Sequence, residues 1–115
     1  MTIHLDSDLF EIVKCGTKNI EARVNDEKRK RLKIGDRIVI LKRPEDIEQI
    51  TAIIEDLIYY DNFVDLVADY TIEELYLNKY TKEEYLNLLK SFYSDDEIKQ
   101  YGTVTIKFRI MDEVS

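Results

Sequence analysis

The chain has 115 residues, of which 44% are hydrophobic and 36% are charged. That composition is typical of one folded domain and excludes an intrinsically disordered chain. One Cys and one His exclude a disulfide framework and a Cys/His zinc site. No apolar run reaches the ~20 residues that span a bilayer, and the first residues lack the layout of a signal peptide. We therefore expect a cytoplasmic protein with a single domain over residues 1–115.

The charge of the chain is unevenly distributed along the sequence. The net charge is −7, which argues against a protein that coats nucleic acid without specificity. Residues 14–43, however, carry 11 basic and 4 acidic side chains, whereas the rest of the chain carries 6 basic and 20 acidic ones. A fold that keeps this segment together has a basic pole that can accept phosphate. Residues 28–33 fit a solvated loop equally well.

Periodicity, capping residues and turn residues together predict the secondary structure. In chain order, we expect a helix over residues 7–14, a strand over 18–24, a turn or one exposed helical turn over 25–31, a strand over 37–41, a turn over 43–46, a strand over 48–59, helical segments that begin near residues 61, 71, 81 and 94, and a closing strand over 103–110.

Local signals set several of these boundaries. Asp6 or Ser7 can cap the first helix, and Gly16 suits the left-handed position that ends it. Residues 81–84 and 94–97 each read as a capping box at the start of a helix.

Strands at both ends of a helical insert favour one closed unit in which the last strand pairs with the earlier strands. A curved, barrel-like sheet with helices packed at its side satisfies that order and hides the sheet edges. The predicted fold class is therefore α+β with a β-barrel and flanking helices, and we expect the strand over 48–59 to pair with the strand before it.

The segment from Gly16 to Arg23 is the most informative in the chain. Glu21 and Arg23 project from the same face of the predicted strand, and Lys18 lies near its start. Arg offers a bidentate fork to carboxylate or phosphate, Lys offers a point charge, and Glu can orient either one. The same pattern also fits a surface strand with a weak ion pair.

These residues form a Gly-x-Lys-x-x-Glu-x-Arg pattern after a short helix, which resembles the signature of the ASCH domain family of the PUA-like superfamily. The resemblance covers the whole chain. Three further segments are similar to motifs of that family, in the same order: residues 34–39, residues 62–66, and residues 93–97 with 101–104.

The resemblance implies a barrel of about six strands beside a cleft lined by Lys18, Glu21 and Arg23, in a domain that binds RNA or a modified base. Some small members are amidohydrolases that deacetylate N4-acetylcytidine with a Lys-Thr-Glu set. Here Glu21 replaces the Thr, the catalytic Glu falls near Asn78, and only Lys18 matches. The residues of members described as metal-dependent ribonucleases do not map onto this chain.

Aromatic side chains near the expected cleft are candidates for stacking on a base. We expect Tyr60 and Tyr101 to form a stacking wall, whereas Phe63 fits the core better. His4 fits a solvated or capping role, and Cys15 at a helix C-terminus is a poor candidate for a reactive thiolate.

We therefore expect a protein that binds RNA or a nucleotide. Lys18 and Arg23 are expected to hold phosphate or an exocyclic oxygen, and Glu21 to orient Arg23 or to accept from a base amine. Basic residues outside the cleft are expected to follow the RNA backbone: Lys28, Arg29, Lys30, Arg31 and Lys33.

Two alternatives remain open from the residues. One is a hydrolase that acts on a modified nucleoside such as N4-acetylcytidine, with Lys18 as base or nucleophile. The other is a protein-interaction adaptor whose acidic helical side is the working surface. We expect no metal or organic cofactor, no membrane contact, and a monomer or weak dimer.

Overall fold

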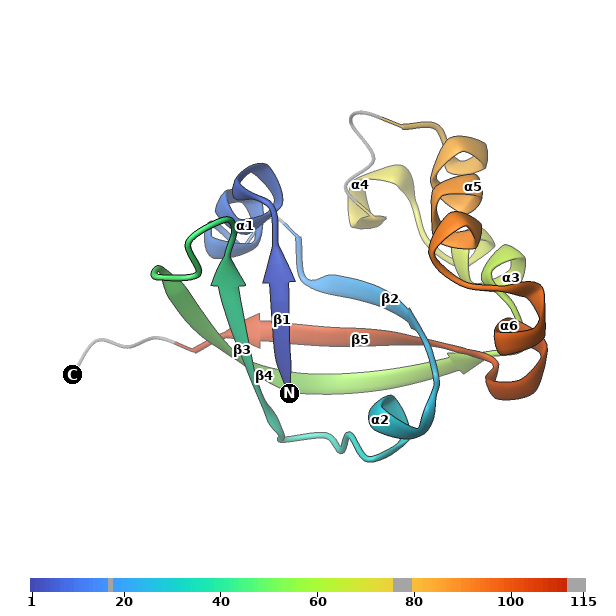
Figure 1. Cartoon of the computed structure of the whole chain (residues 1–115), viewed down its shortest axis with the longest axis horizontal. Helices are drawn as coiled ribbons and strands as arrows, with labels where there is room; N and C mark the ends of the chain where they lie inside the picture. Colours follow the sequence, from blue (N-terminus) through green and yellow to red (C-terminus); the bar gives the residue numbers. More distant parts are fainter. Residues whose placement is uncertain (17, 76–79, 112–115) are drawn as a thin grey trace.

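The centre of the molecule is a five-stranded sheet that curls into half of a barrel (Figure 1). The computed structural model describes residues 1–16, 18–75 and 80–111. The strand order is β1-β3-β4-β5-β2, with β1 parallel to β3 and every other neighbouring pair antiparallel. The strands are β1 (Thr2–Leu5), β2 (Ile20–Val24), β3 (Arg37–Lys42), β4 (Gln49–Tyr60) and β5 (Thr103–Ile110).

Helices cover the sheet in two groups. Helix α1 (Ser7–Lys14) packs beside β1 and β3, and α2 (Glu27–Lys30) follows β2. The remaining helices form the second group between β4 and β5: α3 (Phe63–Ala68), α4 (Ile72–Leu75), α5 (Lys82–Phe92) and α6 (Asp95–Tyr101). The predicted fold class, α+β with a barrel-like sheet and flanking helices, is confirmed.

Strand β1 was not predicted from the sequence. It is only four residues long, and it pairs in parallel with β3, so that Thr2 lies opposite Val39. No local pattern signals a short strand whose partner lies that far along the chain. The described residues also form five strands rather than the expected number of about six.

Strand β4 bends where its pairing with β5 shifts register, between Ile54 and Asp56. Before this bulge, Ile50, Ala52 and Ile54 face the core, and after it Leu57 packs against the same core. The inward positions therefore change from even to odd numbers, as one extra residue in a strand requires. The bulge lets one long strand follow the curl of the sheet.

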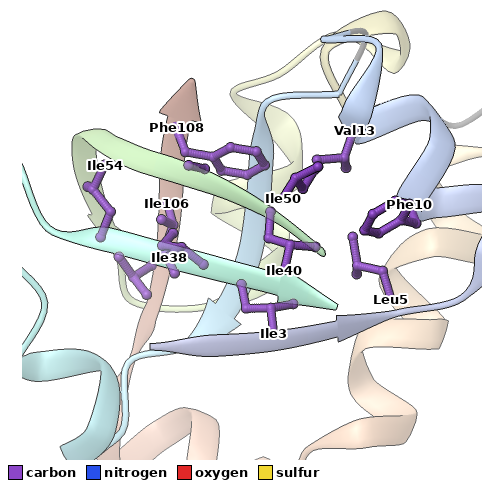
Figure 2. Close-up of a cluster of buried hydrophobic side chains, with 12 residues drawn as sticks. Ile3, Leu5, Phe10, Val13, Ile38, Ile40, Ile50, Ile54, Ile106 and Phe108 are labelled. Atoms are coloured by element: carbon purple, nitrogen blue, oxygen red, sulfur yellow. The ribbon is translucent and has the colours of Figure 1, made fainter. Parts of the chain in front are cut away.

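The first hydrophobic core fills the inside of the half-barrel. Figure 2 shows Phe10 and Val13 of α1 pointing toward Leu5, Ile40 and Ile50 of the sheet. Both α1 side chains have no exposed surface, because the helix presents its apolar side to the open end of the barrel. The first helix is thereby fixed just before the chain enters β2.

The second core lies between β2 and the helices of the second group. Ala22 and Val24 of β2 pack with Phe63, Leu66 and Leu89. Phe63 is 1% exposed, which confirms its expected place in a core. The strand β2 thus contributes to a core with alternate residues and leaves Glu21 and Arg23 on its other face.

Capping residues define the helix ends in the second group. Thr81 with Glu84, and Ser94 with Glu97, form the two predicted capping boxes. At α1, Asp6 takes the cap position but its side chain makes no capping hydrogen bond. The longest described helix, α5, has 11 residues, and no helix in the described parts of the chain is long and apolar enough to span a membrane.

The packing of α1 on the sheet predicts the cost of truncating its central ring. We expect Phe10→Ala to lower the free energy of unfolding by about 3–5 kcal/mol, because it leaves a cavity in a filled core. The matched control is Phe92→Ala, since that ring is 68% exposed and its loss should change the free energy by less than about 0.5 kcal/mol. Urea unfolding measures both, and equal losses would contradict the packing.

Candidate functional site

Lys18 is the one buried lysine of the described residues, with 5% of its surface exposed. Its backbone N–H donates to the carbonyl of Ile12 at 3.3 Å, which ties it to the end of α1. Its Nζ donates to the carbonyl oxygen of Ile20 at 2.6 Å. Burial lowers the pKa of Lys18, because the charged form loses its hydration, and the charge of Glu21 opposes this effect only in part.

Glu21 and Arg23 form a loose ion pair on β2. The distance from Arg23 Nη2 to Glu21 Oε2 is 3.8 Å, and the side chains are 25% and 14% exposed for Arg23 and Glu21. Burial works against the charge of Arg23, but the charge of Glu21 and the Tyr93 hydroxyl outweigh it and raise the pKa of Arg23. The guanidinium therefore stays charged.

These three charged residues lie in one pocket of about 210 Å³. In Figure 1, the elements that line it stand on either side of the start of β2, with α1 and β1 on one side and α4 and α5 on the other. Its described lining consists of Leu5, Leu9, Lys18, Glu21, Ala22, Arg23, Leu75, Tyr80, Tyr85, Leu88, Leu89, Phe92 and Tyr93.

Aromatic rings from α5 and its flanking residues form an aromatic wall of the same pocket. Tyr80 and Phe92 are 41% and 68% exposed at the mouth, whereas burial, helped by the charge of Glu21, raises the pKa of Tyr85. The helix predicted to begin near residue 81 was given no part in the site, so this wall was not predicted. The signal was present in Tyr85, Leu88 and Phe92, whose spacing of three and four residues places them on one helix face.

Tyr60 and Tyr101, the expected stacking wall, lie in a different and larger hollow of about 750 Å³. There they lie beside Asn25 and Tyr59. The Tyr60 hydroxyl donates to the carboxylate of Asp69 at 2.7 Å. The structure therefore does not bring these two rings to the pocket that holds Lys18.

The basic stretch lies beside this second hollow. Lys30 Nζ lies 5.3 Å from the ring centroid of Tyr101, while Arg29 Nη1 lies 3.2 Å from the carboxylate of Asp26. In Figure 1, α2 lies on the opposite side of β2 from α4 and α5. Of the expected backbone residues, Lys28, Lys30, Arg31 and Lys33 are exposed, and Arg29 is half-buried.

The remaining candidates lie outside the pocket. His4 Nδ1 lies 3.3 Å from Asp46 at the surface, and Cys15 is exposed. No group of three or more His, Cys, Asp or Glu in the described residues is arranged to hold a metal ion. Asn78, the position that corresponds to the amidohydrolase Glu, lies outside the described residues.

Comparisons with known proteins agree on one family. The model of the ASCH domain family matches residues 3–111. The crystal structure of hypothetical protein PH0355 is 25% identical with a TM-score of 0.77, and the match covers 96% of this chain and 97% of that one. Protein PF0455 from Pyrococcus furiosus is 23% identical with a TM-score of 0.71, over 97% and 99% of the two chains.

A larger relative shares the fold. ASCH from Zymomonas mobilis is 18% identical with a TM-score of 0.52, and the match covers 96% of this chain and 66% of that one. No curated protein sequence matches this chain.

The burial of Lys18 predicts how its replacement changes stability with pH. Below the lowered pKa the folded protein carries a buried charge, and this cost disappears as the pH rises toward 10.5, the ordinary lysine value. We compare the free energy of unfolding of Lys18→Met with that of the wild type. We expect this difference to favour the variant by on the order of 1 kcal/mol more at neutral pH than near the ordinary lysine pKa. Urea unfolding across this range measures the difference, with exposed Lys28→Met as the control. A difference that does not change with pH would contradict the lowered pKa.

Proposed function

The chain belongs to the ASCH domain family, and from this premise we propose that its pocket holds one nucleobase, in a free nucleoside or in single-stranded RNA. The observation that carries the proposal is the position of Lys18, Glu21 and Arg23, which line one pocket together with aromatic rings. A base offers a flat face and an edge of donors and acceptors. Aromatic rings stack on the flat face, and charged side chains hydrogen-bond to the edge.

The size of the pocket favours a base over a whole nucleotide. Its volume of about 210 Å³ is below the ~300–1,000 Å³ of sites that enclose drug-sized ligands. The exposed rings of Tyr80 and Phe92 leave the mouth open to the ribose and to the neighbouring nucleotides. The charge of Glu21 also makes the pocket a poor site for phosphate, since a carboxylate repels it. The phosphate role expected of Lys18 and Arg23 is therefore less well supported than a role at the base edge.

Amide NMR titrations test this proposal. The four common nucleosides and a short single-stranded RNA of mixed sequence are added to the protein at low and moderate salt. We expect shifts at Glu21, Arg23 and Tyr85 with at least one nucleoside and with the RNA. Shifts with neither ligand would overturn the proposed function.

Variants make the test specific to the pocket. We expect Arg23→Ala to weaken binding of the same ligand about tenfold to a hundredfold, the effect of losing a hydrogen bond from a charged donor. Arg37→Ala is the matched control, because Arg37 is an exposed arginine on β3. Phe92→Ala removes an exposed ring, so it tests stacking without disturbing a core. Equal affinities for Arg23→Ala and Arg37→Ala would contradict a role of the pocket.

The basic stretch is proposed to hold the RNA backbone outside the pocket. Its exposed side chains lie away from the pocket on and after α2, so they can contact phosphates without touching the bound base. We expect Lys28→Ala, Arg31→Ala and Lys33→Ala together to reduce the slope of log affinity against log salt by about 2. Isothermal titration with RNA measures the slope. Nucleoside binding is the control and should not change.

Lys18 supports a second candidate function, hydrolysis of an amide on a modified nucleoside. Its lowered pKa makes a neutral amine available, which can take the proton from an attacking water and return it to the leaving amine. Proton NMR of N4-acetylcytidine incubated with the protein detects acetate if this reaction occurs. The Lys18→Met variant should then bind the nucleoside without releasing acetate, and undiminished turnover would exclude Lys18 as the base.

A further inference from the structure

Glu21 and Arg23 have hydrogen-bonding capacity that the protein itself does not use. The 3.8 Å between Arg23 Nη2 and Glu21 Oε2 is too long for a hydrogen bond. Arg23 Nε is buried and has no hydrogen-bond partner. Within the part of the chain that the structure describes, no hydrogen bond reaches the carboxylate of Glu21. Both side chains are nevertheless largely removed from water.

Unused polar groups in a pocket indicate what a ligand must supply. A donor or acceptor that loses water without gaining a partner destabilises the protein, so a ligand that reaches the exposed parts of these two side chains, 25% for Arg23 and 14% for Glu21, gains affinity from them. An ionised Glu only accepts, through two oxygens side by side, and an Arg only donates. The complementary ligand therefore carries two adjacent N–H donors next to an acceptor oxygen.

The carboxylate beside the cations also disfavours a purely anionic ligand edge. Lys18 uses one Nζ donor on the carbonyl of Ile20, and Arg23 interacts with the Tyr93 hydroxyl, so each side chain keeps further N–H donors for a ligand. Glu21 lies beside Arg23 and repels negative charge. A neutral edge that carries donors as well as acceptors therefore complements these residues best.

Guanine presents this arrangement. Resting on the proposed function, we propose that the pocket selects guanine, with N1–H and the 2-amino group donating to the Glu21 carboxylate and with O6 accepting from Arg23. The aromatic wall of Tyr85 and Phe92 then stacks on the ring. The lining places all four side chains around the same space of about 210 Å³.

The other bases leave part of this set unsatisfied. Adenine and cytosine present one amino group beside a ring nitrogen that only accepts, so one Glu21 oxygen faces an acceptor. Uracil has a single N–H between two carbonyl oxygens, so one of these oxygens faces the carboxylate. A site built to hydrogen-bond an N–H group rejects analogues that lack it, because its own groups then remain unpaired.

Three 5′-monophosphates test the selectivity, since guanosine, inosine and adenosine monophosphate share ribose and phosphate and differ only in the base. Inosine lacks the 2-amino group of guanosine. We expect isothermal titration to give an affinity for the guanosine compound about tenfold above that for the inosine compound and about a hundredfold above that for the adenosine compound. Equal affinity for guanosine and inosine compounds would overturn the assigned contact with the amino group.

The Glu21→Gln variant ties the selectivity to its residue. Glutamine replaces one acceptor oxygen by an N–H donor, so the variant should lose about tenfold or more in affinity for the guanosine compound and none for the adenosine compound. Glu27→Gln is the matched control, since the Glu27 side chain is 74% exposed on α2. An unchanged preference for guanine in Glu21→Gln would overturn the inference.

The two proposals fail in different ways. If adenosine or cytidine monophosphate binds as tightly as guanosine monophosphate and shifts the amides of Glu21 and Arg23, the guanine inference is wrong and the base-binding function stands. If no nucleotide shifts those amides, the proposed function is wrong as well.

Discussion

The pairing of β4 with β5 is the constraint on which the rest of the molecule depends. These are the two longest strands, and each contributes to the core inside the half-barrel. The register shift between Ile54 and Asp56 bends them together, so the sheet curls instead of extending flat. Because β5 also pairs with β2, β2 is held at the edge of this sheet, where Glu21 and Arg23 line one pocket with residues of α5.

The half-barrel does not close, and residues of both edge strands line the pocket. Strands β1 and β2 end the sheet order, and Leu5 of β1 lines the same pocket as Glu21 and Arg23 of β2. An open sheet edge needs protection from solvent and from other chains. Here α1 packs against β1 and β3, and residues of α1 and α5 line the pocket together with both edge strands.

Stability and the proposed binding role make opposing demands on this pocket. A buried Lys18 and an Arg23 with an unpartnered Nε lower stability, because charged and polar groups lose hydration without gaining full partners. An apolar side chain in place of either residue would avoid this loss of hydration. Conflicts of this kind between local structure and stability are concentrated at functional sites, and the buried Lys18 is the feature that the larger hollow around Tyr60 and Tyr101 does not share.

The sequence by itself determined the features that depend on neighbouring residues. Short-range backbone and side-chain interactions set these features, so they could be predicted from the sequence. They are the alternation along β2, the capping boxes at Thr81 and Ser94, and the spacing of Lys18, Glu21 and Arg23. Only the tertiary structure decided the strand β1, the bulge in β4, the aromatic wall on α5 and the separation of Tyr60 from the pocket. Each of these depends on contacts between distant segments. The hydrophobic effect that forms such contacts is non-directional, so a local sequence pattern does not show which segments will meet.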